Sequence, residues 1–179
     1  MMNTPAPQAA PKRGMPTWLI VLLCSAAAVV LLVPVLAVIA IYGMRKYIAN
    51  VKTAEANMHV DEIARDAVTT YSEHGFCPSA SAPVPATIPR AKKYQSSPAD
   101  WQRDSASGAG FACLGFSIGT PQYFQYVYDA QAGRAGFLAQ AHGDLDGDGV
   151  PSTFQIEGRV GADGTPSVAP TIDVDSPQE

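Results

Sequence analysis

An uninterrupted apolar run near the N-terminus constrains this 179-residue chain more than any other feature. The uncharged segment extends from Met15 to Met44, and its most apolar part is Trp18–Tyr42. A bilayer core takes about 20 apolar residues of α-helix, so residues 15–44 are predicted to form a transmembrane helix. The run is longer than the apolar region of a cleaved secretory signal, which covers about 7–15 residues. We therefore expect the segment to remain in the protein as a membrane anchor.

The segments before and after this anchor differ in composition and charge. Residues 1–14 are rich in Pro, Ala and polar residues, and we expect them to form a disordered cytoplasmic leader. Lys12 and Arg13 precede the anchor, whereas all sixteen acidic residues and the other ten basic residues follow it, leaving a net charge of −6 there. This acidic excess argues against a nucleic-acid-binding surface.

Two cysteines after the anchor predict a disulfide bond. Cys77 and Cys113 flank a connection rich in Pro, Ser and Ala, and a cysteine pair in a small exported domain is typical of a disulfide. Closing this loop contributes roughly 3–4 kcal/mol on a chain-entropy estimate. The other interpretation is two separate buried thiols. A disulfide favours a C-terminal domain outside the cytoplasm.

The sequence after the anchor first has a helical period and then an alternating one. Apolar residues recur at steps of three and four as far as Tyr71, so the anchor helix is predicted to continue to about Glu73 and to end before Gly75. Residues 77–110 contain five prolines and are predicted to form an irregular connection, held against the domain by Tyr94 and Trp101.

Four short alternating segments follow and predict strands. They are residues 110–119, 123–130, 135–143 and 152–160. We expect an α+β fold in which a long N-terminal helix, with a transmembrane half and an amphipathic half, packs on a small four-stranded antiparallel sheet. Residues 45–160 form this domain, and residues 161–179 are predicted to be a flexible acidic tail with room for one edge strand.

The stretch "GDLDGDGVPSTF", residues 143–154, is the one segment that suggests metal binding. Its alternating aspartates resemble the first half of an EF-hand calcium loop, but Gln155 stands where the closing carboxylate belongs. Asp-Gly pairs also favour a plain hairpin turn between two strands. Two interpretations therefore stand, a low-affinity structural calcium site and a turn without metal. The predicted calcium ligands are Asp144, Asp146, Asp148, Val150 and Ser152.

Three segments of the chain are similar to type IV pilins and type II secretion pseudopilins. They are "VLAVIAIYGMRKYIANVKTAEA" (35–56), "KKYQSSPADW" (92–101) and "GDLDGDGVPSTF", of which the last two resemble major-pilin-like proteins of myxobacteria. Lys52, Glu55 and Ala56 match the polar run in the pilin helix. The resemblance implies a structural protein, not an enzyme, anchored in the bacterial inner membrane with its domain in the periplasm or at the cell surface. Its partners would be the lipid bilayer and other pilin or pseudopilin subunits, contacted through the N-terminal helix.

The leader departs from the pilin pattern. Pilins are cut after a glycine and carry a glutamate shortly afterwards; here Gly14–Met15 is the matching cut site, and no acidic residue follows it in the apolar run. The resemblance therefore leaves two expectations. The protein is a minor or atypical pilin-like subunit or partner, or it is an uncleaved, membrane-tethered binding or sensor module with a pilin-like domain.

Overall fold

The structure is a computed structural model that describes residues 16–176, apart from the side chains of Arg45, Lys46 and Ala49. The predicted leader and its Gly14–Met15 cut site lie outside the described residues. The chain divides into two compact units, with the boundary between residues 44 and 45. Each unit is described by itself below.

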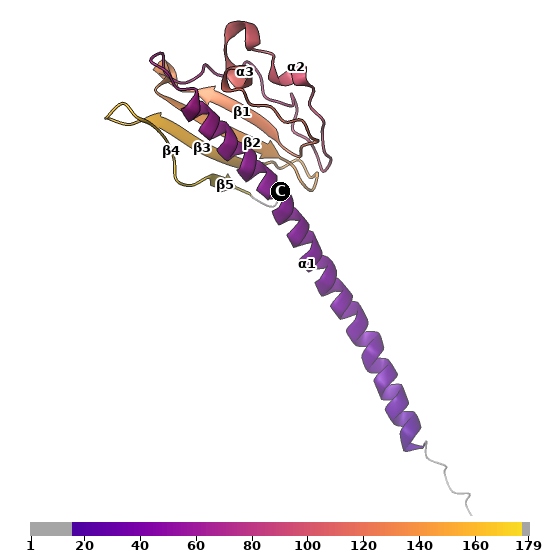
Figure 1. Cartoon of the computed structure of the whole chain (residues 1–179). Helices are drawn as coiled ribbons and strands as arrows, with labels where there is room; N and C mark the ends of the chain where they lie inside the picture. The colour runs from indigo at the N-terminus through magenta and orange to yellow at the C-terminus, as the bar shows by residue number, and fades with distance from the viewer. Residues whose placement is uncertain (1–15, 177–179) are drawn as a thin grey trace, which may run out of the picture. The chain divides into compact units, whose positions relative to one another are not determined.

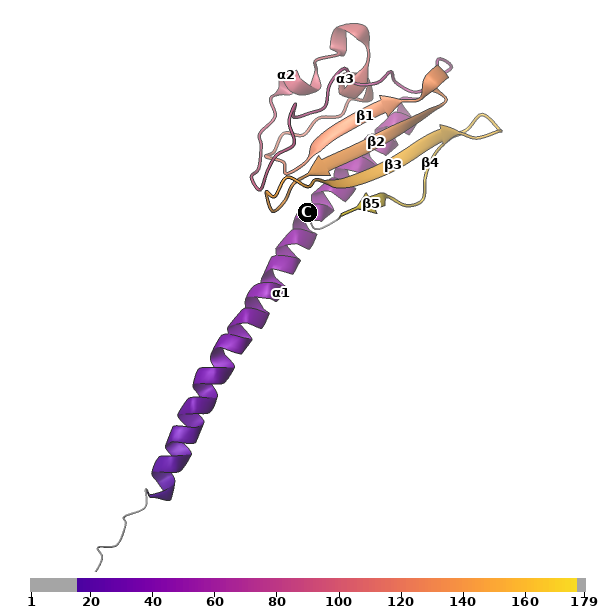
Figure 2. The same cartoon turned by 180° about the vertical axis from the view of Figure 1, so that it is seen from behind.

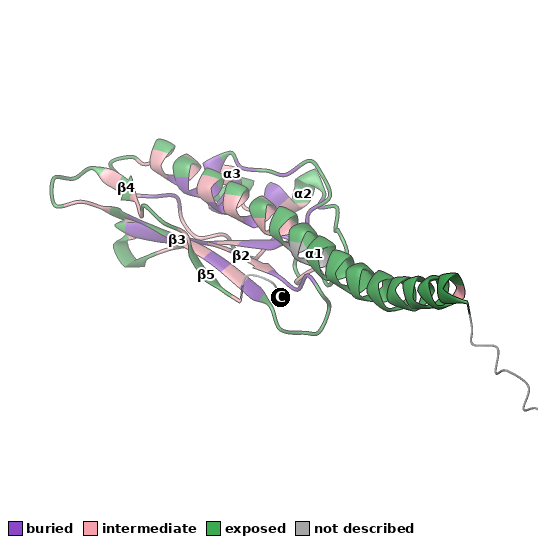
Figure 3. Ribbon diagram, turned by 90° about the horizontal axis from the view of Figure 1, so that it is seen from below, coloured by how far each residue is buried: buried purple, intermediate pink, exposed green. Residues whose placement is uncertain are grey.

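The described part of the first unit is helical. Helix α1 begins at Thr17, ends at Thr69 and contains Pro34. From Thr17 to Met44 its side chains are exposed along almost the whole length (Figure 3). The segment thus forms a helix without a protein core of its own.

The remaining part of α1 belongs to the second unit and buries one face. Its fully buried residues follow the three- and four-residue steps of an amphipathic helix. They are Ala56, Val60, Ile63, Ala64 and Ala67. This part of α1 crosses one face of the sheet in both Figure 1 and Figure 2. Because three of the five residues are alanines, the helix backbone can approach the sheet closely.

The helix ends four residues before the predicted position. The hydroxyls of Thr69 and Thr70 donate to the carbonyl oxygens of Arg65 and Asp66, at 2.8 Å each. Such bonds compete with continued helix formation. The chain then reverses in a turn in which Gly75, at a φ of +89°, donates to the Ser72 carbonyl. Gly75 thus serves this turn and is not the helix cap.

The sheet is antiparallel throughout, which confirms the predicted α+β class. Strands β1 (Gln125–Ala130), β2 (Gly136–Gly143) and β3 (Ser152–Val160) form a meander. Strands β4 (Pro166–Val168) and β5 (Asp173–Asp175) both pair with β3. The sheet has five strands: three of the four predicted strands, and two short ones from the segment predicted to be a flexible tail.

Large and small side chains alternate across the buried face of the sheet. Tyr128 of β1 lies opposite Ala139 of β2, which lies opposite Ile156 of β3. In the same way, Phe137 lies opposite Gly158. Neighbouring strands therefore fill the space beneath α1 without collisions between bulky groups. The residues between these positions form the more polar, half-exposed face.

The connection between α1 and β1 is irregular as predicted, with three short helical turns. These are α2 (Pro98–Trp101), η1 (Ser105–Ser107) and α3 (Gly110–Leu114). The strand predicted over residues 110–119 is wrong. Gly110 and Gly115 have φ values of +56° and +74° and bracket a single helical turn, which buries Phe111 and Leu114 on one side.

The disulfide and Trp101 anchor this connection to the domain as predicted, whereas the side chain of Tyr94 does not. The predicted disulfide between Cys77 and Cys113 is formed, with the Cα atoms 6.0 Å apart. Trp101 is buried and packs edge-on against Phe111 and Phe116, as expected of an anchor. The Tyr94 side chain is 47% exposed, so its predicted anchoring role is wrong. The Tyr94 backbone, however, exchanges two hydrogen bonds with Gln122.

Candidate functional site

The apolar part of α1 is the first candidate functional feature. Thr17–Met44 is 28 residues long, and none of those residues is charged. Long side chains such as Leu31 and Val30 are each 70% exposed. An apolar surface of this extent is typical of a segment that contacts lipid or another protein. By length and composition, this one helix can span a membrane.

A charged and aromatic cluster joins α1 to the start of β1. Glu55 of α1 accepts a hydrogen bond from the Tyr123 backbone N–H at 2.6 Å. The Lys93 ammonium lies 4.0 Å from the same carboxylate. The ammonium groups of Lys52 and Lys93 lie 4.8 and 4.9 Å from the centre of the Tyr123 ring, as cation–π contacts. We call these four residues the Tyr123 cluster.

An aromatic layer lies beneath α1, next to that cluster. His59 packs edge-on against Phe116 and Tyr126, and its Nδ1 lies 3.1 Å from the Glu62 carboxylate. Burial, aided by the negative charges of Glu55 and Glu62, raises the pKa of Tyr126. The phenol is therefore neutral and serves as packing.

The acidic loop joins β2 to β3 and forms a hairpin. Each of the three aspartates accepts a hydrogen bond from a backbone N–H within the loop. Asp144 is buried and accepts two, from Gly147 at 2.6 Å and from Gly149 at 3.1 Å. Both glycines have positive φ values, +86° and +98°, which L-residues rarely adopt. The turn interpretation thus explains the glycines and most of the carboxylate contacts.

The same loop brings the three carboxylates together. Oxygens of Asp144, Asp146 and Asp148 lie within 4.8 Å of one another, a spacing that could hold a metal ion. Carboxylate oxygens are the ligands that calcium prefers. Ser152 does not join them as predicted, because it is buried and its hydroxyl donates to the Gly143 carbonyl at 2.9 Å. Val150 is half-exposed on the same loop.

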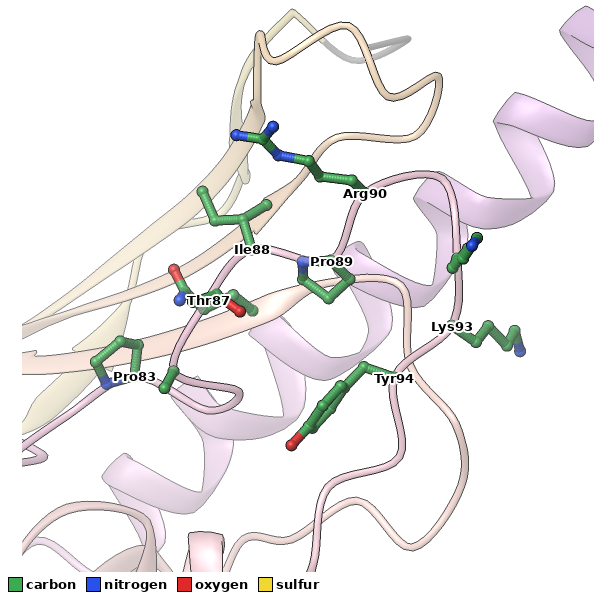
Figure 4. A pocket seen from close by; sticks show the side chains of 10 residues that line it. Pro83, Thr87, Ile88, Pro89, Arg90, Lys93 and Tyr94 are labelled. Atoms are coloured by element: carbon green, nitrogen blue, oxygen red, sulfur yellow. The ribbon is translucent and has the colours of Figure 1, made fainter.

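A surface hollow of about 1010 Å³ lies along residues 83–94, beside β1 (Figure 4). Proline and small or aliphatic side chains form one part of its lining, and charged or polar side chains form the other part: Thr87, Arg90, Lys92, Lys93, Tyr94 and Gln125. Figure 4 shows that the side chains of Lys93 and Tyr94 leave this loop in opposite directions. The Arg90 guanidinium lies 3.8 Å from the Asp144 carboxylate and so ties the loop to the acidic hairpin.

One catalytic pattern escaped the sequence-based prediction. Residues 115–119 read "GFSIG" and match G-x-S-x-G, the pattern of a nucleophile elbow. That elbow requires the serine at a strand-to-helix turn. Ser117 instead lies exposed in the coil between α3 and β1. Within residues 16–176, it forms no hydrogen bond with a histidine. The structural context of an elbow is therefore missing at this pattern.

No family model matches the chain, and no curated protein or solved structure matches it either. The sequence indicated the disulfide and the acidic loop, but it did not indicate the Tyr123 cluster. Lys52 and Glu55 are three residues apart on α1, whereas Lys93 and Tyr123 come from distant loops, so no local spacing connects them.

Proposed function

We propose that this protein is a single-pass membrane protein with a structural, pilin-like role. It would act as a minor or atypical subunit, or a partner, of a type IV pilus or a type II secretion system. The observation that carries the proposal is the composition of α1. One helix has an exposed apolar part, Thr17–Met44, and a later part whose buried face packs on an antiparallel sheet.

The disulfide supports a domain that lies outside the cytoplasm. Disulfides persist in oxidising compartments such as the bacterial periplasm, and Cys77–Cys113 closes the connection that covers the core. The proposed arrangement is an inner-membrane anchor with residues 45–179 in the periplasm or at the cell surface. Thiol alkylation in freshly lysed cells, under denaturing conditions, tests it. Cys24, a free cysteine in the apolar part of α1, should react at once, and Cys77 and Cys113 only after reduction. Immediate labelling of all three would refute it.

A second function is favoured by the sequence of the apolar run. Pilins use a glutamate near the mature N-terminus to pair with a neighbouring subunit, and no acidic residue occurs in residues 15–44. Without that charge, the protein could act as an uncleaved module that tethers a binding or sensor domain to the membrane. The pilin-like domain would then serve without a fibre.

Two measurements on the full-length protein separate these functions. For a subunit, mass spectrometry should find a mature N-terminus at Met15, and filaments sheared from cells should contain the protein. For a tethered module, the leader stays on and the protein stays with the membrane fraction after shearing. A Gly14→Ala variant is the matched control. If the protein is a subunit, this variant should lose both the mature N-terminus at Met15 and its presence in sheared filaments. If it is a tethered module, the variant should behave like the wild type.

A further inference from the structure

Two lysines in the Tyr123 cluster converge on one aromatic ring, although they come from separate parts of the chain. Lys52 lies on α1 and Lys93 on the loop before α2, and each ammonium is less than 5 Å from the Tyr123 ring centre. Lysine side chains are long and rotatable, so both ammonium groups can reach the oxygens of one bound anion.

The charge balance of the cluster is positive. Glu55 is its one carboxylate; one of its oxygens accepts the Tyr123 N–H and the other lies 4.0 Å from Lys93. Over residues 16–176, Lys52 forms no ion pair, and neither does the neighbouring Lys92. Lys92 is exposed beside Lys93. Such a concentration of cations contrasts with the −6 net charge of the sequence after the anchor.

The position of Lys52 along α1 indicates which anion is available. Lys52 follows Met44, the last residue of the candidate span, by eight positions in the sequence, so the chain itself keeps it within reach of the end of the span. The headgroup layer extends roughly 5–7 Å beyond the hydrocarbon core, and lysines that flank a membrane span place their ammonium groups in that layer.

The residues at the end of the span and just after it suit the same layer. Tyr42 and Tyr47 are 72% and 70% exposed, and tyrosine is enriched where a membrane-spanning helix crosses the lipid–water boundary. Ile48 and Val51 add exposed apolar surface on the following turn. Tyrosines, aliphatic side chains and Lys52 therefore lie close together in the sequence at the end of the span, with the basic residues Arg45 and Lys46 among them.

We propose that Lys52 and Lys93, held by Tyr123, bind the phosphate of an anionic phospholipid headgroup. The lipid would hold the domain at the membrane surface. Basic residues near a membrane surface each favour anionic lipid by about 1 kcal/mol, or about fivefold in affinity. The inference rests on α1 spanning the bilayer and is independent of the pilin-like role.

Native mass spectrometry of the full chain in nonionic detergent tests the site. Phosphatidylglycerol and phosphatidylcholine are titrated separately, and the ratio of their affinities is measured. The wild-type protein should prefer phosphatidylglycerol. Lys52→Gln and Lys93→Gln should each reduce that preference about fivefold, and the double variant about 25-fold. The matched control is Arg65→Gln with Arg159→Gln, which removes two charges from side chains that are 75% and 72% exposed elsewhere. It should leave the preference unchanged.

A variant that gains affinity separates binding from misfolding. Glu55→Gln keeps an acceptor for the Tyr123 N–H but removes the one negative charge of the cluster, so the phosphatidylglycerol preference should rise several-fold. Equal phosphatidylglycerol preferences in the wild type, the double lysine variant and the control would overturn the proposal. That result would not bear on whether α1 spans the membrane. Glycerol 3-phosphate at equal concentration should not displace the lipid. If it does, the site takes a soluble phosphate and lipid docking is refuted.

Discussion

Tyr126 and Tyr128 stand two residues apart on the buried face of β1, but only one of their hydroxyls is satisfied. The Tyr128 hydroxyl donates to the Cys77 carbonyl at 3.2 Å, which ties the strand to the disulfide-bonded connection. The Tyr126 hydroxyl is buried and has no hydrogen-bond partner among the described residues. Two chemically identical side chains should therefore respond in opposite ways to loss of the hydroxyl.

We expect Tyr126→Phe to raise the free energy of unfolding by about 1 kcal/mol, because it removes a desolvated hydroxyl that forms no bond. Tyr128→Phe should lower it by about 1 kcal/mol, because the Cys77 carbonyl loses its donor. Urea denaturation of the two variants and the wild type measures both effects. A destabilised Tyr126→Phe protein would show that this hydroxyl has a partner after all.

Gly158 lies beneath the Phe137 ring, and a Cβ there would come within 2.0 Å of the ring carbon Cε1. We expect Gly158→Ala to cost about 1–3 kcal/mol of stability, because either the ring or strand β3 must move. Gly119→Ala is the matched control, since nothing lies within 4 Å of the added carbon. Equal thermal midpoints for the two variants would contradict this packing.

The acidic hairpin should respond to calcium. Its three carboxylates repel one another, and a bound cation would relieve that repulsion. A site with the dissociation constant of extracellular modules, about 10⁻⁴–10⁻³ M, would add on the order of 1–3 kcal/mol to the free energy of unfolding at about 10 mM calcium. Asp146→Asn with Asp148→Asn should abolish this gain while leaving the two bonds to Asp144 intact. Asp173→Asn with Asp175→Asn on β5 is the control. A melting temperature that is the same in calcium and in chelator would leave the loop as a hairpin turn alone.

Stability should fall as the pH drops below about 6.5, in part through His142. Burial lowers the pKa of this side chain on β2, so the unfolded chain binds a proton that the folded protein resists. The folded protein has the full stability that neutral His142 allows when the pH is above the unfolded-state pKa of about 6.5. It loses that stability as the pH falls below this value. Denaturant midpoints at pH 7.5 and 5.5 measure the loss, and His142→Gln should reduce it. The control, His74→Gln, changes a side chain that is 74% exposed and should have no effect.

The elements that the sequence predicted correctly are those with sustained periodicity. The apolar run and the buried series from Ala56 to Ala67 follow helical steps, and β1 to β3 alternate over six to nine residues. The prediction failed at residues 110–119, where Phe111 and Cys113 are two apart and imitate a strand. Two glycines with positive φ impose a helical turn there, and backbone conformation of this kind leaves no trace in an apolar pattern.

The same distinction, between local patterns and tertiary packing, applies to the candidate sites. The aspartates of the hairpin alternate within five residues, so their spacing was visible in the sequence, but the use of the Ser152 hydroxyl depends on where strand β3 begins. The bond between Glu55 and Tyr123 joins residues 68 positions apart. Contacts of that separation follow from tertiary packing, which a single sequence does not encode in any local pattern.

The two short strands at the end of the chain also determine what the outer border of the sheet offers to other molecules. β5 covers Thr153–Gln155 and β4 covers Gly158–Val160, so β3 is bordered by two separate pieces and not by one long strand. One piece begins with Pro166, and the other carries Asp173 and Asp175. At the opposite border, Val84 exchanges two hydrogen bonds with Tyr126 and covers part of β1. Short, charged or covered borders resist edge-to-edge aggregation, so the sheet should resist strand pairing between copies even at high local concentration.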